Sequence, residues 1–283
     1  MDLSVVIPCL DAAEVLAGQL EALRAQQWRG SWDVIVADNG STDDTRTVAE
    51  KFRPVLDIRV VDASDRAGRQ HACNVGARAG GRAVVFVDAD DEVAPGYIAA
   101  MGEALAQHAI VAARIDHVTL NDGWVVDGRS AAQTNALQNH LGFLPFGSGG
   151  TLGVRADVFE AVGGFASDMH YAEDIDFCWR AQLAGYDIGF VPDAVLRYRY
   201  RTRLRSMFTQ HRKFGRASAL LYRTYRDRGM PRFGTQSMLR EWRQVATGLL
   251  LVRGRGDAAR WARRMGRDVG RLQGSARFRV WFP

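Results

Sequence analysis

The sequence predicts an α/β fold, a mostly parallel sheet with helices on both faces, followed by a helical C-terminal extension. In the first half, short β-branched runs alternate with stretches that carry apolar residues at helical spacing. That alternation is typical of β-α-β units, which build parallel sheets. Beyond residue 200 the strand pattern stops, and apolar residues recur every three or four positions among many arginines. This second pattern predicts amphipathic helices.

The expected strands of the first half lie at residues 3–8, 33–37, 58–61 and 83–87, with helices between them. Leu16, Leu20 and Leu23 form one face of the first helix. The turn at residues 39–42 leads into a second helix that continues to residue 51, and Ser41 or Thr42 can cap that helix. A helix of small residues at 67–79 precedes the fourth strand.

The pattern changes after about residue 110. Runs at 111–120 and 124–126, joined by Asn121-Asp122-Gly123, predict a hairpin. A glycine-rich segment at 147–150 precedes a short strand and a helix at 156–162. The next helix begins at residue 173 and ends at Gly185, and a strand at 185–191 follows it. Three further helices are expected, with apolar faces along 204–225, 238–249 and 258–272.

The most informative stretch is the fourth strand together with the acids that follow it. The apolar run at 84–87 leads into Asp88, Asp90, Asp91 and Glu92. Carboxylates this close repel one another. A divalent cation that prefers oxygen ligands, Mn²⁺ or Mg²⁺, removes that repulsion. The alternative interpretation is an acidic cap for the helix expected to begin near Pro95.

Charge divides the chain unevenly. Residues 1–196 hold 14 basic and 28 acidic side chains, whereas residues 197–283 hold 23 basic and 4 acidic ones. The two balances, −14 and +19, give the net charge of +5. They predict an acidic working domain followed by a basic contact segment. We expect three parts: residues 1–108 and 109–200 as the two halves of one domain, and 201–283 as a basic helical extension.

Cysteine usage and the apolar runs indicate a cellular location. Cys9, Cys73 and Cys178 lack metal-type spacing and fit a reducing compartment. Met1-Asp2 is acidic and the first apolar run stops at Asp11, so we expect no signal peptide. No apolar run has the length needed to span a bilayer. The expected location is cytoplasmic, on the inner face of the membrane if the tail binds lipid.

Four motifs resemble the nucleotide-sugar glycosyltransferases of family 2, which have the GT-A fold. They are residues 4–11 (SVVIPCLD), 38–43 (DNGSTD), 86–91 (FVDADD) and 173–180 (EDIDFCWR). The motifs occur in the family's order and at its usual spacing, and the resemblance covers about residues 1–200. Each motif alone is weakly specific, whereas four in order are strongly specific.

The resemblance implies a role for each matching residue near the donor. Pro8, Asp11 and Asp38 would line the pocket for the nucleobase and ribose, with Asp38 accepting a base N–H. Asp90 would bind the metal directly, and Asp88 would face the ribose or a metal-bound water. The full set implied for donor binding is Pro8, Asp11, Asp38, Asn39, Arg69, Asn74, Asp88 and Ala89, and the set implied for the metal is Asp90 and Asp88.

The resemblance also implies a catalytic base, Asp174, whose surroundings Glu173 would shape. The chain departs from the family pattern at the position of Cys73, where many members have an arginine that contacts the diphosphate. Arg69 or Arg66 would have to supply that contact here. An aspartate is a weak base with a reference pKa of about 3.9, so the role requires burial or nearby acids that raise this value.

The activity implied is an inverting, metal-dependent transfer of a sugar from a nucleoside-diphosphate sugar to an acceptor hydroxyl. The acceptor would be a saccharide, a glycolipid or another hydroxyl compound, in the synthesis of cell-envelope polysaccharide or glycolipid. Nucleotidyl or phosphoryl transfer is a second class, disfavoured because no glycine-rich phosphate loop with lysine is present. Nucleic-acid binding through the tail is a third class, disfavoured because the acidic first 196 residues would repel phosphate.

The basic tail has three interpretations: contact with an anionic membrane, packing on the catalytic domain, or an interface in a homo-oligomer. Trp242 and Trp261 lie on the apolar faces of its helices, as in helices that lie in a membrane interface. For residues 204–225, packing on the domain is as strongly expected as membrane contact. For residues 258–272, five arginines favour membrane contact.

Overall fold

A computed structural model describes residues 2–127, 129 and 132–283. Its centre is an eight-stranded sheet with the strand order β3-β2-β1-β4-β9-β6-β10-β5. All of these strands except β9 and β5 run in the same direction, which confirms the mostly parallel sheet. The strands are β1 Leu3–Cys9, β2 Trp32–Asp38, β3 Ile58–Asp62, β4 Ala83–Phe86, β5 Glu92–Val93, β6 Ile110–Asp116, β9 Leu152–Arg155 and β10 Ile188–Arg197.

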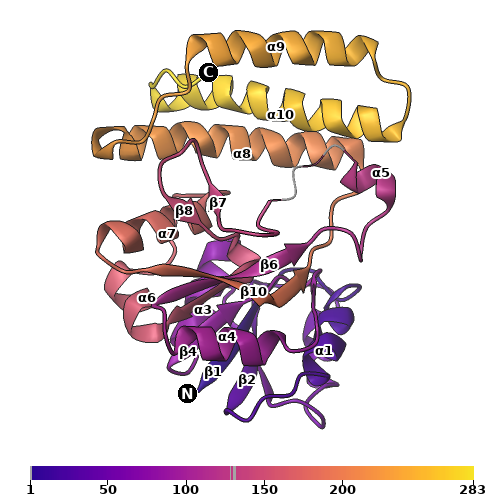
Figure 1. Cartoon of the computed structure of the whole chain (residues 1–283). Helices are drawn as coiled ribbons and strands as arrows, with labels where there is room; N and C mark the ends of the chain where they lie inside the picture. The colour runs from indigo at the N-terminus through magenta and orange to yellow at the C-terminus, as the bar shows by residue number, and fades with distance from the viewer. Residues whose placement is uncertain (1, 128, 130–131) are drawn as a thin grey trace.

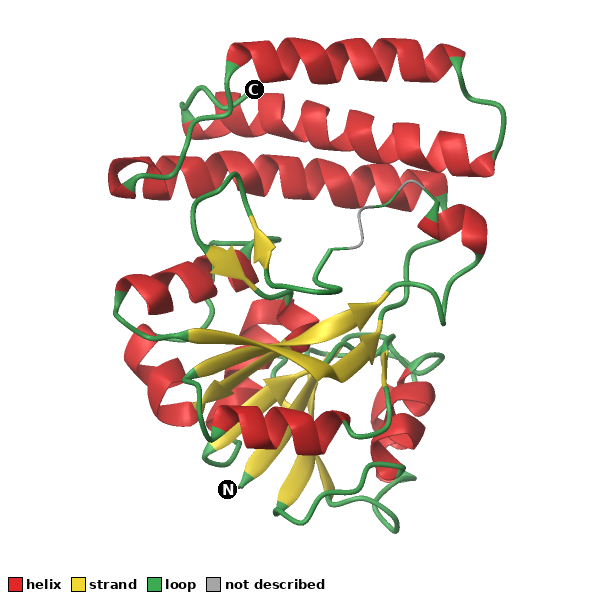
Figure 2. Ribbon diagram, in the orientation of Figure 1, coloured by secondary structure: helices red, strands yellow, loops and turns green. Residues whose placement is uncertain are grey.

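Helices cover both faces of the sheet (Figures 1 and 2). Alternate strand residues separate the two cores: Val5 and Ile7 pack with one set of helices, and Val6 packs with the other. The first set is α1 Leu16–Arg24, α2 Thr45–Glu50 and α4 Tyr97–Leu105, and the second is α3 Arg69–Arg78, α6 Ala156–Val162 and α7 Glu173–Leu183. The expected layered α/β architecture is therefore confirmed.

The predicted hairpin after residue 110 is wrong. Strand β6 ends at Asp116, and residues Gly123–Val126 form a short helix, α5. Both edges of β6 are already paired, with β9 on one side and β10 on the other. The Asp116 carboxylate accepts the backbone N–H groups of Val118 at 2.8 Å and Thr119 at 3.1 Å, which turns the chain out of the sheet. A small separate sheet pairs β7 Gln138–Asn139 with β8 Pro145–Phe146.

The cap expected from Ser41 or Thr42 is also wrong, because helix α2 begins only at Thr45. The Ser41 hydroxyl instead accepts the backbone N–H of Asp11 at 3.0 Å. Asp43 accepts the backbone N–H of Thr45 at 3.0 Å. The hydroxyls of this turn therefore tie it to the neighbouring β1–α1 loop.

Three helices form a layer over one end of the sheet domain: α8 Leu204–Tyr225, α9 Thr235–Leu250 and α10 Arg255–Phe278. Helix α8 lies next to the sheet domain, α10 lies on α8, and α9 is outermost (Figure 1). Helices α8 and α10 touch backbone to backbone, since a Cβ at Gly215 or at Gly270 would lie 2.0 Å from a carbonyl oxygen of the other helix. The short helix α7 joins this layer through Trp179, which packs edge-on against Tyr225 of α8.

The packing of α10 changes the interpretation of its arginines. Arg263 and Arg271 are 6% and 5% exposed, so the helix has no fully solvated arginine face. Arg271 pairs with Glu241 of α9 and, at 2.8 Å, with Asp268. The argument that five arginines exceed what a solvated face requires is therefore wrong for this helix. Among the described residues, no helix combines the length and the apolar character needed to cross a membrane.

Candidate functional site

The acids singled out in the sequence gather along one edge of the sheet. Asp38 is the last residue of β2, and Asp88 lies two residues beyond β4. Strands β1, β2 and β4 are parallel neighbours, so their carboxyl ends form one continuous rim. Ligands of open α/β sheets bind at such a rim. Helix α7 brings Glu173 and Asp174 to the same place, because Arg69 of α3 contacts both Asp88 and Glu173.

At the β2 end of this rim, Asp38 is fully buried and already engaged. Its carboxylate accepts the backbone N–H of Ser41 at 3.0 Å and pairs with Arg46 of α2. Arg46 also reaches Asp62 at the end of β3, 3.4 Å away. The guanidinium is half exposed, so this corner offers a cation beside a buried carboxylate. The sequence analysis missed Arg46. Its position in the first turn of α2, the helix that follows the strand ending at Asp38, could have indicated an ion pair with that aspartate.

The β1 end of the rim carries Pro8 and Asp11. Pro8 pairs in register with Ala37 of β2. Asp11 has a positive φ of 48°, a conformation that aspartate adopts more readily than most residues. Its carboxylate accepts the backbone N–H of Thr42 at 2.8 Å. Pro8 and Asp38 thus lie at the carboxyl ends of the neighbouring strands β1 and β2, and Asp11 lies in the loop that follows β1.

Two asparagines from the predicted donor set have their side chains occupied by backbone groups. Asn39 donates to the carbonyls of Ala63 and Arg66 and accepts the N–H of Gly68 at 2.7 Å. Asn74 makes two 2.9 Å bonds to the backbone of Phe165. Asn39 thereby fixes the loop that leads to Arg69, and Asn74 fixes the loop that leads towards α7. In this structure both side chains hold loops in place.

The acids after β4 form a crowded group. Burial, Asp88 and Asp90 together raise the pKa of Asp91 well above its usual range. Burial and the Asp88 carboxylate raise the pKa of Asp90. Arg199 donates its backbone N–H to Asp91 at 2.8 Å and its side chain to the Asp90 carbonyl at 2.8 Å. Sequence reasoning missed Arg199, which reaches the acids from the segment after β10.

The chemistry of this group fits a divalent cation. Among the described residues, no side chain donates a hydrogen bond to the Asp90 carboxylate, and Asp91 Oδ2 is buried without a partner. The described residues contain no cluster of three or more potential ligands spaced to hold a metal by themselves. A site of one or two carboxylates completed by water and substrate phosphates is how Mg²⁺ is usually bound. Ala89, which separates the two acids, is buried in the core.

Arg69 connects the acid group to helix α7. Its Nη2 lies 2.7 Å and its Nε 2.8 Å from Asp88 Oδ1, and its Nη1 lies 3.5 Å from Glu173 Oε1. Glycines make this approach possible: a Cβ at Gly149 would lie 3.0 Å from the Arg69 guanidinium, and one at Gly150 would lie 2.8 Å from Asp88 Oδ2. The glycine-rich segment therefore packs its backbone directly against this ion pair.

Asp174 lies beside this bridge in the first turn of α7. Its Oδ2 accepts the N–H of Gly149 at 2.9 Å, and its Oδ1 accepts the N–H of Ile175 at 2.8 Å. Burial raises the pKa of Asp174 even though these two N–H groups act against the shift. Burial and the Asp174 charge also raise the pKa of Glu173. Helix α7 thus presents two adjacent carboxyls with raised proton affinity, the property that a general base requires.

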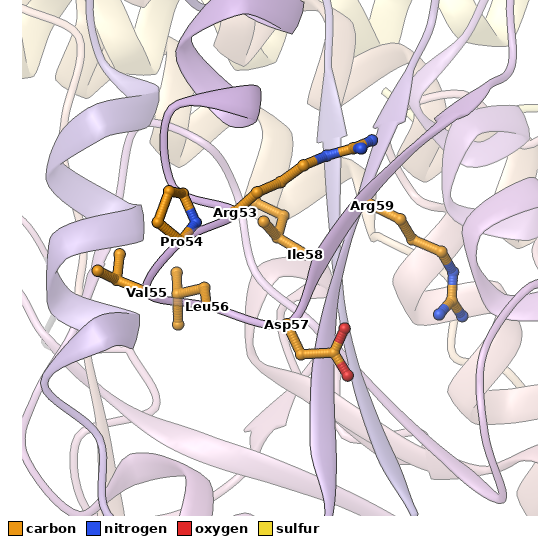
Figure 3. A pocket seen from close by; sticks show the side chains of 7 residues that line it. All are labelled: Arg53, Pro54, Val55, Leu56, Asp57, Ile58 and Arg59. Carbon is orange, nitrogen blue, oxygen red and sulfur yellow. The ribbon is translucent and has the colours of Figure 1, made fainter.

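The structure also has a hollow of about 580 Å³ at another part of the surface (Figure 3). It is lined by residues 53–59, at the amino end of β3. Ligands of parallel sheets bind at the carboxyl ends of the strands, and Asp57 is the lining residue with a carboxylate. We therefore place the candidate site at the acidic rim rather than in this hollow.

Comparison with known proteins identifies relatives along the chain. Residues 4–163 match the family profile described as "Glycosyl transferase family 2". A pre-mycofactocin glycosyltransferase of Mycobacterium tuberculosis is 29% identical over 265 residues, which cover 88% of this chain and 54% of the relative. The chain thus spans about half the length of that relative. The succinoglycan biosynthesis protein ExoA of Rhizobium meliloti is 26% identical over 246 residues, which cover 83% of this chain and 73% of that protein.

Solved structures share the fold. The mannosyltransferase PcManGT of Pyrobaculum calidifontis, in complex with GDP-Man and Mn²⁺, aligns over 95% of this chain and 86% of its own, with a TM-score of 0.68 and 19% identity. The S. aureus TarS 1–349 structure in complex with UDP aligns over 100% of this chain and 93% of its own, with a TM-score of 0.57 and 19% identity. The family match covers more than half of the sequence, and the protein is therefore a member of glycosyltransferase family 2 with a GT-A-like fold.

Proposed function

We propose that this glycosyltransferase moves a sugar from a nucleoside-diphosphate sugar to an acceptor hydroxyl with inversion at the anomeric carbon, and that the reaction depends on Mn²⁺ or Mg²⁺. The observation that carries the proposal is the placement of Asp174. Its carboxylate is oriented by two backbone N–H groups, and burial raises its pKa. Its neighbour Glu173 is linked through Arg69 to Asp88, which follows β4.

In this proposal, Asp174 takes the proton from the acceptor hydroxyl as that oxygen attacks the sugar. The raised pKa makes the carboxylate a stronger base than an ordinary aspartate. Burial keeps that pKa high, and the Asp174 charge in turn raises the pKa of Glu173. The Arg69 guanidinium opposes both shifts and so limits the repulsion between the two carboxyls. Attack from the side opposite the leaving diphosphate inverts the anomeric carbon.

Asp90, with Asp88, would hold the metal, and Asp38 with Arg46 would hold the nucleoside. When bound, the divalent cation supplies Lewis-acid stabilisation of the diphosphate leaving group. Asp88 can turn towards the ribose or the metal once donor phosphates compete for Arg69. Arg69 then supplies the diphosphate contact that Cys73 cannot make, because the Cys73 thiol is buried and burial raises its pKa to about 12. The neighbours seen with GDP-Man and with UDP motivate guanine and uracil donors as the first to test.

The acceptor belongs, in this proposal, to cell-envelope polysaccharide or glycolipid synthesis, as the names of the bacterial relatives suggest. An anionic membrane surface is the proposed partner of the tail. The end of α9, rather than α10, supports this part of the proposal. Leu249, Leu250 and Leu251 are 56%, 85% and 61% exposed there. The nearby Arg253 and Arg255 are exposed as well. Apolar side chains flanked by arginines suit an anionic lipid interface.

Donor hydrolysis tests the proposal directly. The wild-type chain should release nucleoside diphosphate from GDP-mannose or UDP-N-acetylglucosamine in Mn²⁺, and EDTA should stop the reaction. Asp90→Asn should lose metal-supported nucleoside diphosphate binding while keeping the thermal unfolding midpoint of the wild type within a few degrees. Turnover of either donor that continues undiminished in EDTA would contradict the metal assignment.

A further inference from the structure

Beside the candidate site lies a basic cavity that the proposed reaction has not used. It measures about 320 Å³ and opens to solvent between the loop before α7 and the first half of α8. Its charged lining residues are Arg201, Arg205 and Lys213, and none of the described residues that line it is acidic. Within the described part of the chain, none of these three cations forms an ion pair with a carboxylate.

The cavity adjoins both halves of the candidate site. On one side, Arg201 lies two residues after Arg199, which donates hydrogen bonds to Asp91 and to the Asp90 carbonyl. On the other side, Tyr171 lines the cavity and lies two residues before Glu173. The cavity therefore lies between the segment that contacts the acids after β4 and the loop that leads into α7.

Helix α8 holds the loop that carries Tyr171. Lys213 donates to the Tyr171 hydroxyl and lies 4.5 Å from the centre of its ring. Phe214 packs edge-on against the same ring at 6.2 Å. Tyr171 adopts a positive φ of 66°, a conformation that costs free energy unless surrounding contacts impose it. Contacts with α8 thus hold Tyr171 in place in the cavity wall, while the side chains of Arg201, Arg205 and Lys213 are exposed to solvent.

The residues between the cations can donate hydrogen bonds as well. Ser206, Thr209 and Gln210 line the cavity with two hydroxyls and an amide. Several cations with neutral donors between them suit a phosphate group, whose oxygens accept multiple charge-assisted hydrogen bonds. The nucleoside corner at Asp38 lies at the ends of β2 and β3, whereas this cavity lies on α8. Because Tyr171 of its wall lies in the loop that leads into α7, which carries the candidate base, this placement favours the acceptor over the nucleoside of the donor.

We propose that this cavity binds a phosphate monoester or diester carried by the acceptor, next to the hydroxyl that is glycosylated. The inference rests on the proposed function for its place in the reaction, but binding of the phosphate can be measured without turnover. Arg205 and Lys213 would bind the phosphate oxygens, and Arg201 would lie between this group and the donor diphosphate. An acceptor so held would present its hydroxyl towards the carboxyls of α7.

Calorimetric titration with phenyl phosphate, in EDTA and low salt, tests the binding. The double variant Arg205→Ala with Lys213→Ala should bind at least about tenfold more weakly than the wild type, because two charge-assisted contacts are lost. The control is Arg223→Ala with Arg228→Ala, which removes two exposed arginines outside the cavity. The control should keep the wild-type affinity, since the remaining net charge is the same in the two variants. Circular dichroism melts verify that both variants are folded.

Three results would overturn the proposal. Undiminished binding by the cavity variant, or equal weakening in both variants, would show that the cavity is not the site. Inorganic phosphate binding as tightly as phenyl phosphate would indicate a site for the free ion. Expulsion of phenyl phosphate by GDP or UDP with Mn²⁺ would assign the cavity to the donor. Failure of the proposed function appears separately, as absent nucleotide binding and donor hydrolysis in an otherwise unchanged phenyl phosphate titration.

Discussion

Replacing Arg69 by methionine is the most informative single perturbation of this site. The substitution keeps an unbranched apolar stem but removes the guanidinium that lies 2.7 Å from Asp88 and 3.5 Å from Glu173. Both carboxylates then remain in a partly enclosed site without a cation. We expect the variant without bound ligand to have a lower free energy of unfolding than the wild type. The difference should be greatest at a pH at which both carboxyl groups are ionised.

The magnitude follows from the contacts and their exposure. Hydrogen bonds to charged groups contribute about 1.5–3 kcal/mol, and breaking a fully buried ion pair costs about 3–5 kcal/mol. Arg69 and Asp88 are each 29% exposed, so solvent screens the pair and the lower range applies. For a chain of this size each kcal/mol shifts the unfolding temperature by about 2–4 °C, which predicts a decrease of roughly 3–12 °C.

Differential scanning calorimetry in EDTA between pH 5 and pH 8 measures this loss. The difference in unfolding temperature between the variant and the wild type should become smaller as the pH falls. The pKa of Glu173 is already raised, and it rises further when the Arg69 charge is removed. Protonation of Glu173 then removes its repulsion with Asp88. Arg78→Met on the same helix is the control, since Arg78 is exposed and should change stability by less than about 0.5 kcal/mol. A deficit that is absent, or that is the same at pH 5 and pH 8, would refute the assignment of Arg69 as the bridge.

Further predictions concern the packing of the tail, the nucleoside corner and the pH profile. Gly270→Ala should lower the free energy of unfolding by about 1–3 kcal/mol, because its Cβ would lie 2.0 Å from the Arg212 carbonyl oxygen. Gly248→Ala is the control, because its Cβ would have no neighbour closer than 3.6 Å. In the same urea titrations it should raise the free energy of unfolding by up to about 1 kcal/mol. Arg46→Ala should lower the urea midpoint, since it leaves the fully buried carboxylate at the end of β2 without its cation; an unchanged urea midpoint would contradict this. The rate of sugar transfer should fall on acidification at a pH above the range of an ordinary aspartate, because the pKa of the base is raised and only its ionised form accepts a proton. A pH–rate profile that stays flat down to pH 4 would contradict the base assignment.

Local patterns in the sequence predicted most of the fold because strand and helix periodicity is a local property. The four strands β1 to β4, the helices on both faces and the three tail helices all lie where apolar periodicity placed them. The hairpin failed because Asn121-Asp122-Gly123 is a local turn signal, whereas the partners of β6 come from residues 152–155 and 188–197. Pairing between strands that are far apart in the sequence cannot be recognised from a local pattern of about ten residues.

The sequence singled out candidate residues that directly follow a buried strand, and it missed contacts made between distant parts of the chain. Asp88 and Asp90 stand out because a buried strand runs directly into them. The contact of Arg46 with Asp38 and the N–H of Gly149 on Asp174 depend on how distant loops meet. The number of arginines in residues 258–272 was also a misleading argument for membrane contact. Arginine counts cannot distinguish an exposed side chain from Arg263, which helix packing buries.

The most direct test of the proposed mechanism compares Asp174→Asn with Asp157→Asn in donor binding and in sugar transfer. Both aspartates lie in the first turn of a helix, but Asp157 is on α6, where it pairs with Arg155 in solvent. We expect both variants to bind nucleoside diphosphate and Mn²⁺ with nearly wild-type affinity. Transfer by Asp174→Asn should be slower by about a hundredfold or more, the scale of a lost general base, while Asp157→Asn stays at the wild-type rate. Wild-type transfer by Asp174→Asn would contradict the assignment and move the role to Glu173.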